Sequence, residues 1–244
     1  MYGPSDGGFR KHALPVITKC IHGSAPFLTT FLLIHLSAPL LANLGGSSLA
    51  SQTLLLGREY YQTELGEKYL LLGPIVLHTV SGLAKRLISP SKVPPRPWTS
   101  LLSITGYGTM LFFLPIHFST HRVSPSNPIA PIHALSPSEL DFEYIKFGLN
   151  SWPWRSAFLY GGLVVFALLH AADGERILFN TYLGPALGRI KASTRKGMIA
   201  AVMGAVALPV LTGLYFLSQE PEMIFASMAD RFHASFVSSM WYRL

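Results

Sequence analysis

The sequence predicts an all-α fold, that of a polytopic membrane protein with five transmembrane helices. Half of the 244 residues are hydrophobic, only 13% are charged, and the mean hydropathy is +0.37. A soluble domain of this size carries about a quarter charged residues. A helical span needs about 17–25 mostly apolar residues, and five stretches of the chain meet that requirement. They lack the alternating pattern of membrane β-strands, so helices are expected.

The five expected spans are residues 24–44, 68–88, 101–120, 156–172 and 198–217, and the fourth is also compatible with an extension through residue 179. They divide the chain into a short N-terminal tail (1–23), a transmembrane domain (24–217) and an amphipathic C-terminal segment (218–244). In that last segment apolar residues recur at roughly helical spacing: Ile224, Met228, Phe232, Phe236 and Met240. This pattern predicts a helix at the membrane interface or packed on the bundle. Residues 89–98, rich in proline, and 121–155, long and polar, are expected as loops.

The distribution of charge predicts the topology. With five spans, 12 of the 19 Lys and Arg residues lie on the side of the N-terminus, and nine of the 12 Asp and Glu residues lie on the other side. Because positive charge marks the cytosolic side of membrane proteins, the N-terminus is expected there and the C-terminus opposite. The net charge of +7 therefore reflects topology, and no nucleic-acid partner is expected. The single cysteine, Cys20, cannot form an intrachain disulfide.

Each of the first four spans contains one histidine, and the fifth contains none: His35, His78, His117 and His170. Ionisable residues inside lipid are rare and usually functional. One alternative is that each ring stays neutral and hydrogen-bonds a neighbour. A proton relay is another, but it usually recruits Asp or Glu, and no acid falls within the expected spans. A structural zinc site needs four ligands at one depth, and these four histidines lie at different depths.

The depths favour heme. His117 lies near one end of its span and His170 near the opposite end, while His35 and His78 are close to the middle. A bis-histidine heme needs two ligands at similar depth on facing helices. We therefore expect spans 1–4 to form a bundle with two b-type hemes, one held by His35 and His117 and one by His78 and His170. A single heme between His35 and His78, or no heme, are the alternatives.

The neighbouring residues suit this interpretation. HTVSG at 78–82 and HAADG at 170–174 share the pattern His-x-x-x-Gly. Residues i and i+4 share one helix face, so Gly82 and Gly174 leave room for a flat macrocycle beside each ligand. Arg86 lies eight residues after His78, and Arg176 lies six residues after His170. Both cations suit contacts to heme propionates, and they suit positive-inside anchoring of the helices equally well.

Four histidine-bearing helices followed by a fifth resemble, in architecture, the diheme cytochrome b anchor of fumarate reductases and succinate dehydrogenases. Three stretches resemble more closely a fungal family, the mitochondrial outer-membrane adapter known as the Mdm-complementing protein, whose membrane domain is similar to those anchors. They are GREYYQTELGEKYLLLGPIVLHTVSGLAKRL at 57–87, FLLIHLSAPLLANLGG at 31–46 and LLHAADG at 168–174. The resemblance extends over roughly residues 24–215.

This resemblance implies a location in the mitochondrial outer membrane, with the N-terminus in the cytosol and the C-terminus in the intermembrane space. It also implies a role in lipid homeostasis at organelle contact sites. In that family a short Pro-x-Pro peptide on the cytosolic side recruits a bridge-like lipid-transfer protein to contacts with the vacuole. The N-terminal tail of this chain lacks such a peptide, and the candidate is Pro95-Arg96-Pro97 in the loop after span 2. The alternative is that these prolines only stiffen the loop.

Two functions of different classes follow. The first is a non-enzymatic membrane adapter, with membrane lipids and the lipid-transfer protein as its partners. The alternative is a b-type cytochrome that transfers electrons in the membrane, with a quinone as one partner. A small transporter is disfavoured because the sequence has no inverted repeat. The sequence shows no cysteine pair, phosphate-binding loop or buried acid–base pair, which favours a protein that is not an enzyme.

Overall fold

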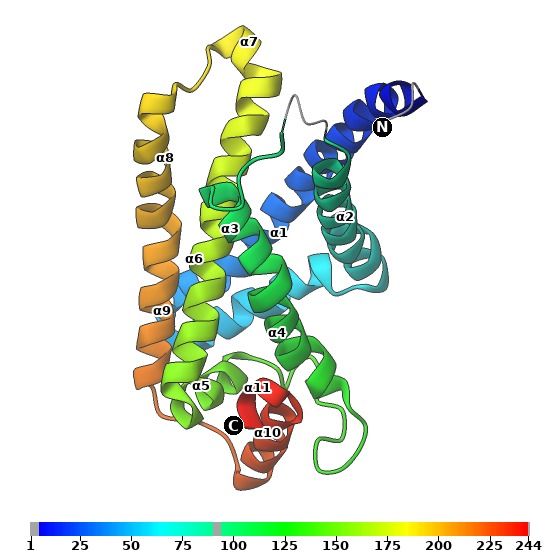
Figure 1. Ribbon diagram of the computed structural model, residues 1–244. Coiled ribbons are helices and arrows are strands. Elements are labelled where there is room, and N and C mark those ends of the chain that lie inside the picture. Colours follow the sequence, from blue (N-terminus) through cyan, green and yellow to red (C-terminus); the bar gives the residue numbers. More distant parts are fainter. Residues whose placement is uncertain (1–4, 90–93, 244) are drawn as a thin grey trace.

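The computed structural model describes residues 5–89 and 94–243, and every regular element within these ranges is helical. The expected all-α fold is therefore confirmed. Among the described residues, five helices are long and apolar enough to cross a membrane: Gly8–Tyr61, Gly66–Ile88, Leu101–Ser126, Pro153–Leu187 and Ala192–Gln219. Each contains one of the five expected spans. The N-terminus and the C-terminus lie at opposite ends of the molecule (Figure 1).

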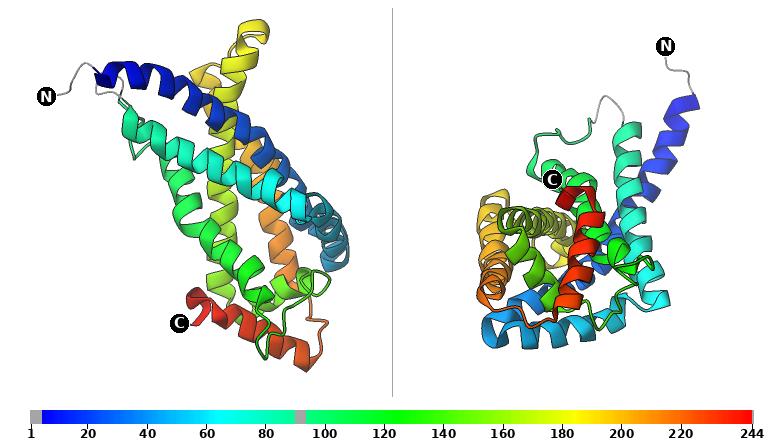
Figure 2. Two further views of the ribbon diagram at one scale, coloured as in Figure 1. Left: turned by 90° about the vertical axis from the view of Figure 1, so that its right-hand side faces the viewer. Right: turned by 90° about the horizontal axis from the view of Figure 1, so that it is seen from below.

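The first helix, α1 (Ser5–Tyr61), begins inside the segment expected as a tail and bends at Gly45 and Gly46. Gly46 has a φ of +58°, a left-handed conformation that favours glycine. A Cβ atom there would collide with the carboxylate of Glu220. That carboxylate accepts hydrogen bonds of 3.0 and 3.3 Å from the backbone N–H of Ser47, where a helix start favours an anion. The bend turns the second part of α1 across the end of the bundle toward α2 (Figures 1 and 2).

The second and third spans are built from several helical pieces. The second consists of a π-helical segment, Gly66–Leu72, and α2 (Gly73–Ile88). The third consists of α3 (Leu101–Gly108), a π segment (Thr109–Phe113), α4 (Leu114–Phe118), a second π segment (Ser119–Val123) and a 3-10 turn (Ser124–Ser126). Short π segments inside α-helices are frequent at functional sites. With its second π segment, the third span continues past residue 120, where the expected span ended, and it includes His121.

The fourth span consists of α6 (Pro153–Leu178), a π segment (Phe179–Leu183) and α7 (Gly184–Leu187). The extension of this helix past residue 172 is thus present in the structure. The fifth consists of a 3-10 turn (Ala192–Thr194), α8 (Arg195–Val202), a π segment (Met203–Ala207) and α9 (Leu208–Gln219). Figure 1 shows α7 at the end where the N-terminus lies.

Residues 121–155 are more ordered than a polar loop, and in this respect the sequence-based expectation was wrong. They include α5 (Phe142–Ser151), which is capped by Asp141 through a 2.8 Å hydrogen bond from the N–H of Glu143. The C-terminal segment forms α10 (Ala226–Ser238) and α11 (Met240–Arg243). Phe232 and Phe236 of α10 are buried, so this segment packs on the bundle, the second of the two expected arrangements (Figure 2).

The apolar core is unevenly distributed. The buried apolar residues of the described chain form three clusters, which draw on α1, α4, α5, α6, α9, α10 and α11 and on the loop and π segments between them. None of these clusters contains a residue of α2. That helix packs mainly on α1, and Val76, Leu77 and Val80 are exposed, as expected of side chains that face lipid. The region between α2 and α6 is therefore not part of the packed core.

Candidate functional site

The structure brings the four span histidines together in two pairs. The ring centroids of His35 and His117 are 6.0 Å apart, and those of His78 and His170 are 6.1 Å apart. These are the pairs that their depths favoured, and His35 is not paired with His78. Two imidazoles that bind one metal ion from opposite sides, at metal–nitrogen distances of about 2 Å, have ring centroids roughly 6 Å apart. Both pairs therefore have the spacing of two axial ligands.

The pair on the side of the N-terminus, the N-side pair, consists of His78 in α2 and His170 in α6. The Nδ1 of His170 lies 3.1 Å from the carbonyl oxygen of Leu102 in α3; a carbonyl can only accept, so this Nδ1 donates. The Nδ1 of His78 lies 3.1 Å from the hydroxyl of Ser24 and 3.2 Å from the carbonyl of Ile21, both in α1. The Ser24 hydroxyl already donates to that carbonyl at 2.9 Å. Both rings therefore carry their proton on Nδ1 and present a free Nε2 lone pair, as metal-binding histidines do.

The other pair, the C-side pair, consists of His35 in α1 and His117 in α4. The Nδ1 of His35 lies 3.1 Å from the hydroxyl of Tyr61, which belongs to the part of α1 after the bend. The ring of Phe31 stacks on His35 at a centroid distance of 5.2 Å. The Nδ1 of His117 is buried and has no hydrogen-bond partner among the described residues. Only one ring of this pair is therefore held by a protein hydrogen bond.

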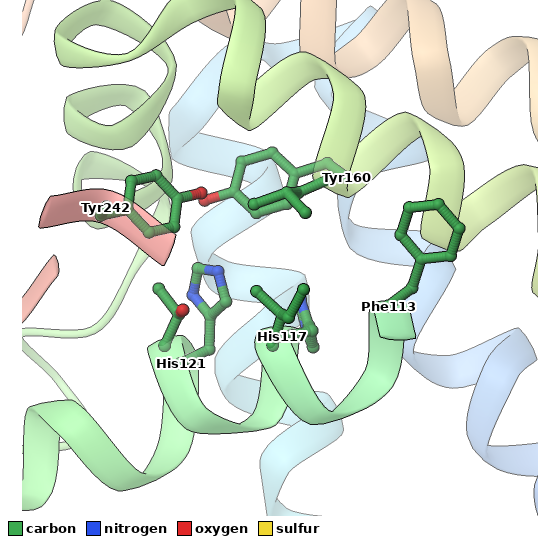
Figure 3. A pocket seen from close by; sticks show the side chains of 8 residues that line it. Phe113, His117, His121, Tyr160 and Tyr242 are labelled. Carbon is green, nitrogen blue, oxygen red and sulfur yellow. The ribbon is translucent and has the colours of Figure 1, made fainter. Parts of the chain in front are cut away.

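A third histidine, His121, belongs to this region and was not among the sequence-predicted site residues. Its ring centroid lies 4.5 Å from that of His117. Figure 3 shows both rings beside a small cavity, with the phenols of Tyr160 and Tyr242 across from them. The cavity is about 10 Å³ in volume, close to the least that a water molecule needs. The signal in the sequence was HFSTH at 117–121, two histidines one helical turn apart.

Unpartnered polar atoms surround this cavity. Among the described residues, the Nδ1 of His117 and the Nε2 of His121 are buried without a hydrogen bond. The hydroxyl of Tyr160 points toward that of Tyr242 (Figure 3). Burial raises the pKa of Tyr242, so its hydroxyl stays neutral at neutral pH and can donate or accept. Buried polar groups of this kind are usually satisfied by a bound group or by water.

The two predicted glycines leave open space. A Cβ atom built on Gly82 or on Gly174 would meet no heavy atom within 4 Å, although both residues are partly buried. Gly106 in α3 is different, because a Cβ atom there would lie 2.7 Å from the ring of His170. Gly106 thus allows the close approach of α3 to His170, a role that sequence reasoning missed.

The predicted cations have other contacts. The guanidinium of Arg86 lies 3.6 Å from the centroid of the Trp98 ring, in a cation–π contact. The Nε of Arg176 lies 3.7 Å from a carboxylate oxygen of Asp173. Propionate binding by either residue stays a prediction. Pro95 and Pro97 are exposed in a non-helical segment, residues 94–97, and so are accessible to a partner.

The donor sets suit heme. Within residues 5–89 and 94–243, no group of three or more His, Cys, Asp and Glu side chains is arranged to hold a metal ion. A heme macrocycle supplies four nitrogens of its own and takes only axial ligands from the protein, for which a pair of imidazoles is sufficient. The pair spacing, the protonation of Nδ1 in the N-side pair and the space at Gly82 and Gly174 all fit such a group.

The fold and the histidines together define a class: a five-helix membrane protein with two facing histidine pairs between its helices. No protein-family model, no curated protein and no solved structure matches the chain.

Proposed function

We propose that the chain binds two b-type hemes, one at the N-side pair and one at the C-side pair. The observation that carries this proposal is the matched spacing of the pairs, 6.0 and 6.1 Å between ring centroids, in histidines from four different spans. The alternative of four separately satisfied neutral rings accounts less well for this spacing. It also leaves the buried Nδ1 of His117 without a partner.

The residues of this chain have definite roles in the proposal. His78 and His170 offer Nε2 to one group, and His35 and His117 offer theirs to the other. Heme held by these histidines would supply one-electron redox chemistry. The hydrogen bonds from Nδ1 to Ile21 and Leu102 hold the N-side rings in the required tautomer.

Absorption spectroscopy tests the heme proposal. The full chain, purified in detergent from heme-replete cells, is expected to show a Soret band and an α band that sharpens on reduction. His78→Ala and His117→Ala are each expected to lose about half of the heme, and the double variant nearly all of it. His12→Ala is the matched control, because His12 is exposed at the start of α1. A colourless wild-type preparation, or equal heme content in all variants, would refute the proposal.

A second proposal concerns the role of the whole protein. We propose a non-enzymatic adapter of the mitochondrial outer membrane that supports lipid homeostasis, with its N-terminus in the cytosol and its C-terminus in the intermembrane space. It recruits a bridge-like lipid-transfer protein to contacts with the vacuole. The supporting observation is that Pro95 and Pro97 lie in an exposed, non-helical segment, since proline-rich segments of this kind form recognition elements of low conformational entropy. The sequence resemblance to the adapter family points the same way.

Relocalisation tests the adapter role. In a fungal cell, expression of the tagged chain is expected to bring the lipid-transfer protein to mitochondria. Pro95→Ala with Pro97→Ala is expected to abolish that movement, whereas Pro94→Ala, the matched control in the same segment, is expected to keep it. Recruitment that does not depend on Pro95 and Pro97, or no recruitment at all, contradicts the proposal.

The alternative role is electron transfer in the membrane with a quinone. It is favoured by the placement of the two pairs. Leu102, which holds His170, and His117 belong to one continuous helical span and are separated by roughly 20 Å of helix rise. Two hemes at these places could pass electrons from one half of the membrane to the other. Quinol-dependent reduction of the heme bands would favour this role, and heme that no quinol reduces would favour a purely structural one.

A further inference from the structure

A polar cavity lies at the N-terminal end of the bundle, away from the small cavity at His117. Its volume is about 350 Å³. Three segments line it: the residues that lead into α3, the last turns of α6, and the start of α8. The charged residues in the lining are three arginines and one acid: Arg96, Arg176, Arg195 and Asp173.

The single acid is already committed to other residues. Asp173 accepts two hydrogen bonds from Arg195, at 2.7 and 2.6 Å, in a bidentate pair. Arg176 is 3.7 Å from the same carboxylate, and its buried Nε has no hydrogen bond among the described residues. Arg96 is exposed and interacts electrostatically with Asp173, but within the described residues no hydrogen bond or ion pair holds it. The cavity therefore has an excess of positive charge.

One helix start adds to this charge. α3 begins at Leu101, and this residue lines the cavity. The first N–H groups of a helix have no intrahelical acceptor, and the helix dipole places partial positive charge there. Ser100, the N-cap of α3, turns its hydroxyl to Ser103. Arginine forks and helix N-termini are the groups with which proteins bind phosphate.

We propose that this cavity binds a phosphate group, and that the phosphate belongs to the headgroup of an anionic phospholipid. The cavity lies at the starts of the third and fifth spans, Leu101–Ser126 and Ala192–Gln219, where the headgroups of the bilayer are found. Basic pockets between such helices are typical sites for anionic lipids. Leu101 and Leu102 complete the lining on the apolar side. This inference does not depend on either proposed function.

The main competing occupant is the heme proposed for the N-side pair. The carbonyl of Leu102, a residue of the cavity lining, accepts the hydrogen bond from His170, so heme carboxylates could reach these arginines. The two occupants differ in a measurable way. A lipid site weakened by mutation leaves the heme content unchanged, whereas loss of a carboxylate anchor lowers it.

Native mass spectrometry of the full chain in detergent tests the proposal. The protein is titrated separately with phosphatidic acid, with phosphatidylcholine and with inorganic phosphate. Wild-type protein is expected to bind one phosphatidic acid in preference to phosphatidylcholine. Arg96→Gln is expected to weaken that binding about tenfold, the effect of losing one charged hydrogen bond. Arg189→Gln, which removes the same charge from an exposed position outside the lining, is expected to leave it unchanged.

Each other outcome overturns part of the proposal. Binding of inorganic phosphate without phosphatidic acid would assign the site to a soluble phosphate rather than a lipid. Equal binding of both lipids, or equal affinity in wild type and Arg96→Gln, would reject a phosphate site. Heme content is measured in the same samples. A loss of heme in Arg96→Gln with unchanged lipid binding would assign the cavity to the heme carboxylates. Arg96 is exposed and lies in a non-helical segment, so the variant is expected to purify normally.

Discussion

The two histidine pairs have nearly the same spacing but different surroundings. The N-side rings are held by backbone carbonyls of two neighbouring helices, and the clusters of buried apolar residues leave α2 out. The C-side rings lie next to a dense aromatic cluster. The Nδ1 of His35 has a side-chain partner, the hydroxyl of Tyr61, and the Nδ1 of His117 has no partner among the described residues. A backbone carbonyl cannot be removed by mutation, whereas a hydroxyl can. The C-side pair is therefore expected to be the more sensitive to substitution.

The largest expected effect is on the aromatic cluster of the C-side half. Phe236 is fully buried, and its ring stacks on Tyr144 at a centroid distance of 4.5 Å and lies 6.1 Å from His121. Phe236→Ala is expected to lower the free energy of unfolding by about 3–5 kcal/mol, as for other buried phenylalanines. Denaturant unfolding in detergent measures it. Phe225→Ala is the control, since Phe225 is 86% exposed, and equal effects of the two changes would refute the expected contrast.

The next effect is on the hydrogen bonds to Nδ1. Tyr61→Phe removes the hydroxyl that lies 3.1 Å from the Nδ1 of His35, and loss of a hydrogen-bond partner of a metal-binding histidine reduces metal affinity by about 10–100-fold. Ser24→Ala is expected to do much less to the N-side pair, because the carbonyl of Ile21 remains as an acceptor for His78. Heme dissociation rates measure the difference. Equal rates in the two variants would contradict the contrast between the pairs.

A smaller effect is expected at the open glycines of the N-side pair. Gly82→Leu and Gly174→Leu fill space that no protein atom occupies, so both should fold normally but weaken heme binding at this pair. Overpacking of this size costs about 1–3 kcal/mol. Gly197→Leu is the matched control, since a Cβ atom there also meets nothing within 4 Å. Heme per chain measures occupancy, and full occupancy in Gly82→Leu argues against a group beside that residue.

The smallest expected effect is the loss of stability in acid that two glutamates cause, Glu139 and Glu220. Hydrogen bonds from Ser136 and Arg231 hold the pKa of Glu139 below its ordinary value. Burial acts to raise the pKa of Glu220, but hydrogen bonds from Ser47 and the nearby Lys146 outweigh it and leave this pKa lowered. Groups with a lowered folded pKa stabilise the protein above their unfolded pKa of about 4.3 and lose that contribution as the pH falls through the folded value.

Thermal unfolding measured from pH 7 downward checks this response. The midpoint temperature of unfolding is expected to decrease once the pH is below about 4.3. Each of these partly exposed pairs is expected to contribute less than about 1 kcal/mol to this loss of stability. Glu139→Gln is expected to remove part of the decline and to leave the neutral-pH midpoint slightly lower. A pH profile of Glu139→Gln identical to that of wild type contradicts the assignment.

The class of fold and the pairing of the histidines could be predicted from the sequence, because both depend on the lengths of the apolar stretches and on the direction in which each crosses the membrane. Five apolar stretches alternate in direction through the membrane, and this alternation sets the depth of each histidine. The expected pairs, His35 with His117 and His78 with His170, follow from depth alone, and the structure places the rings of each pair next to each other, nearly perpendicular.

Other features depend on contacts between distant residues and have no local signal. The bend at Gly46 needs the carboxylate of Glu220. The burial of α5 needs an ion pair between Lys146, whose side chain is 1% exposed, and two acids, Glu143 at 2.7 Å and Glu220 at 3.4 Å. A sequence pattern containing this lysine indicates a surface loop. The cavity of three arginines likewise joins segments that are far apart in the chain.

The most direct test of the account is the heme-to-polypeptide ratio of the full wild-type chain, purified from heme-replete cells and quantified against protein mass. Two histidine pairs with the spacing of axial ligands predict two hemes per chain, both low-spin. A ratio of one would contradict the independence of the two pairs, and a ratio of zero would contradict heme binding by this chain altogether.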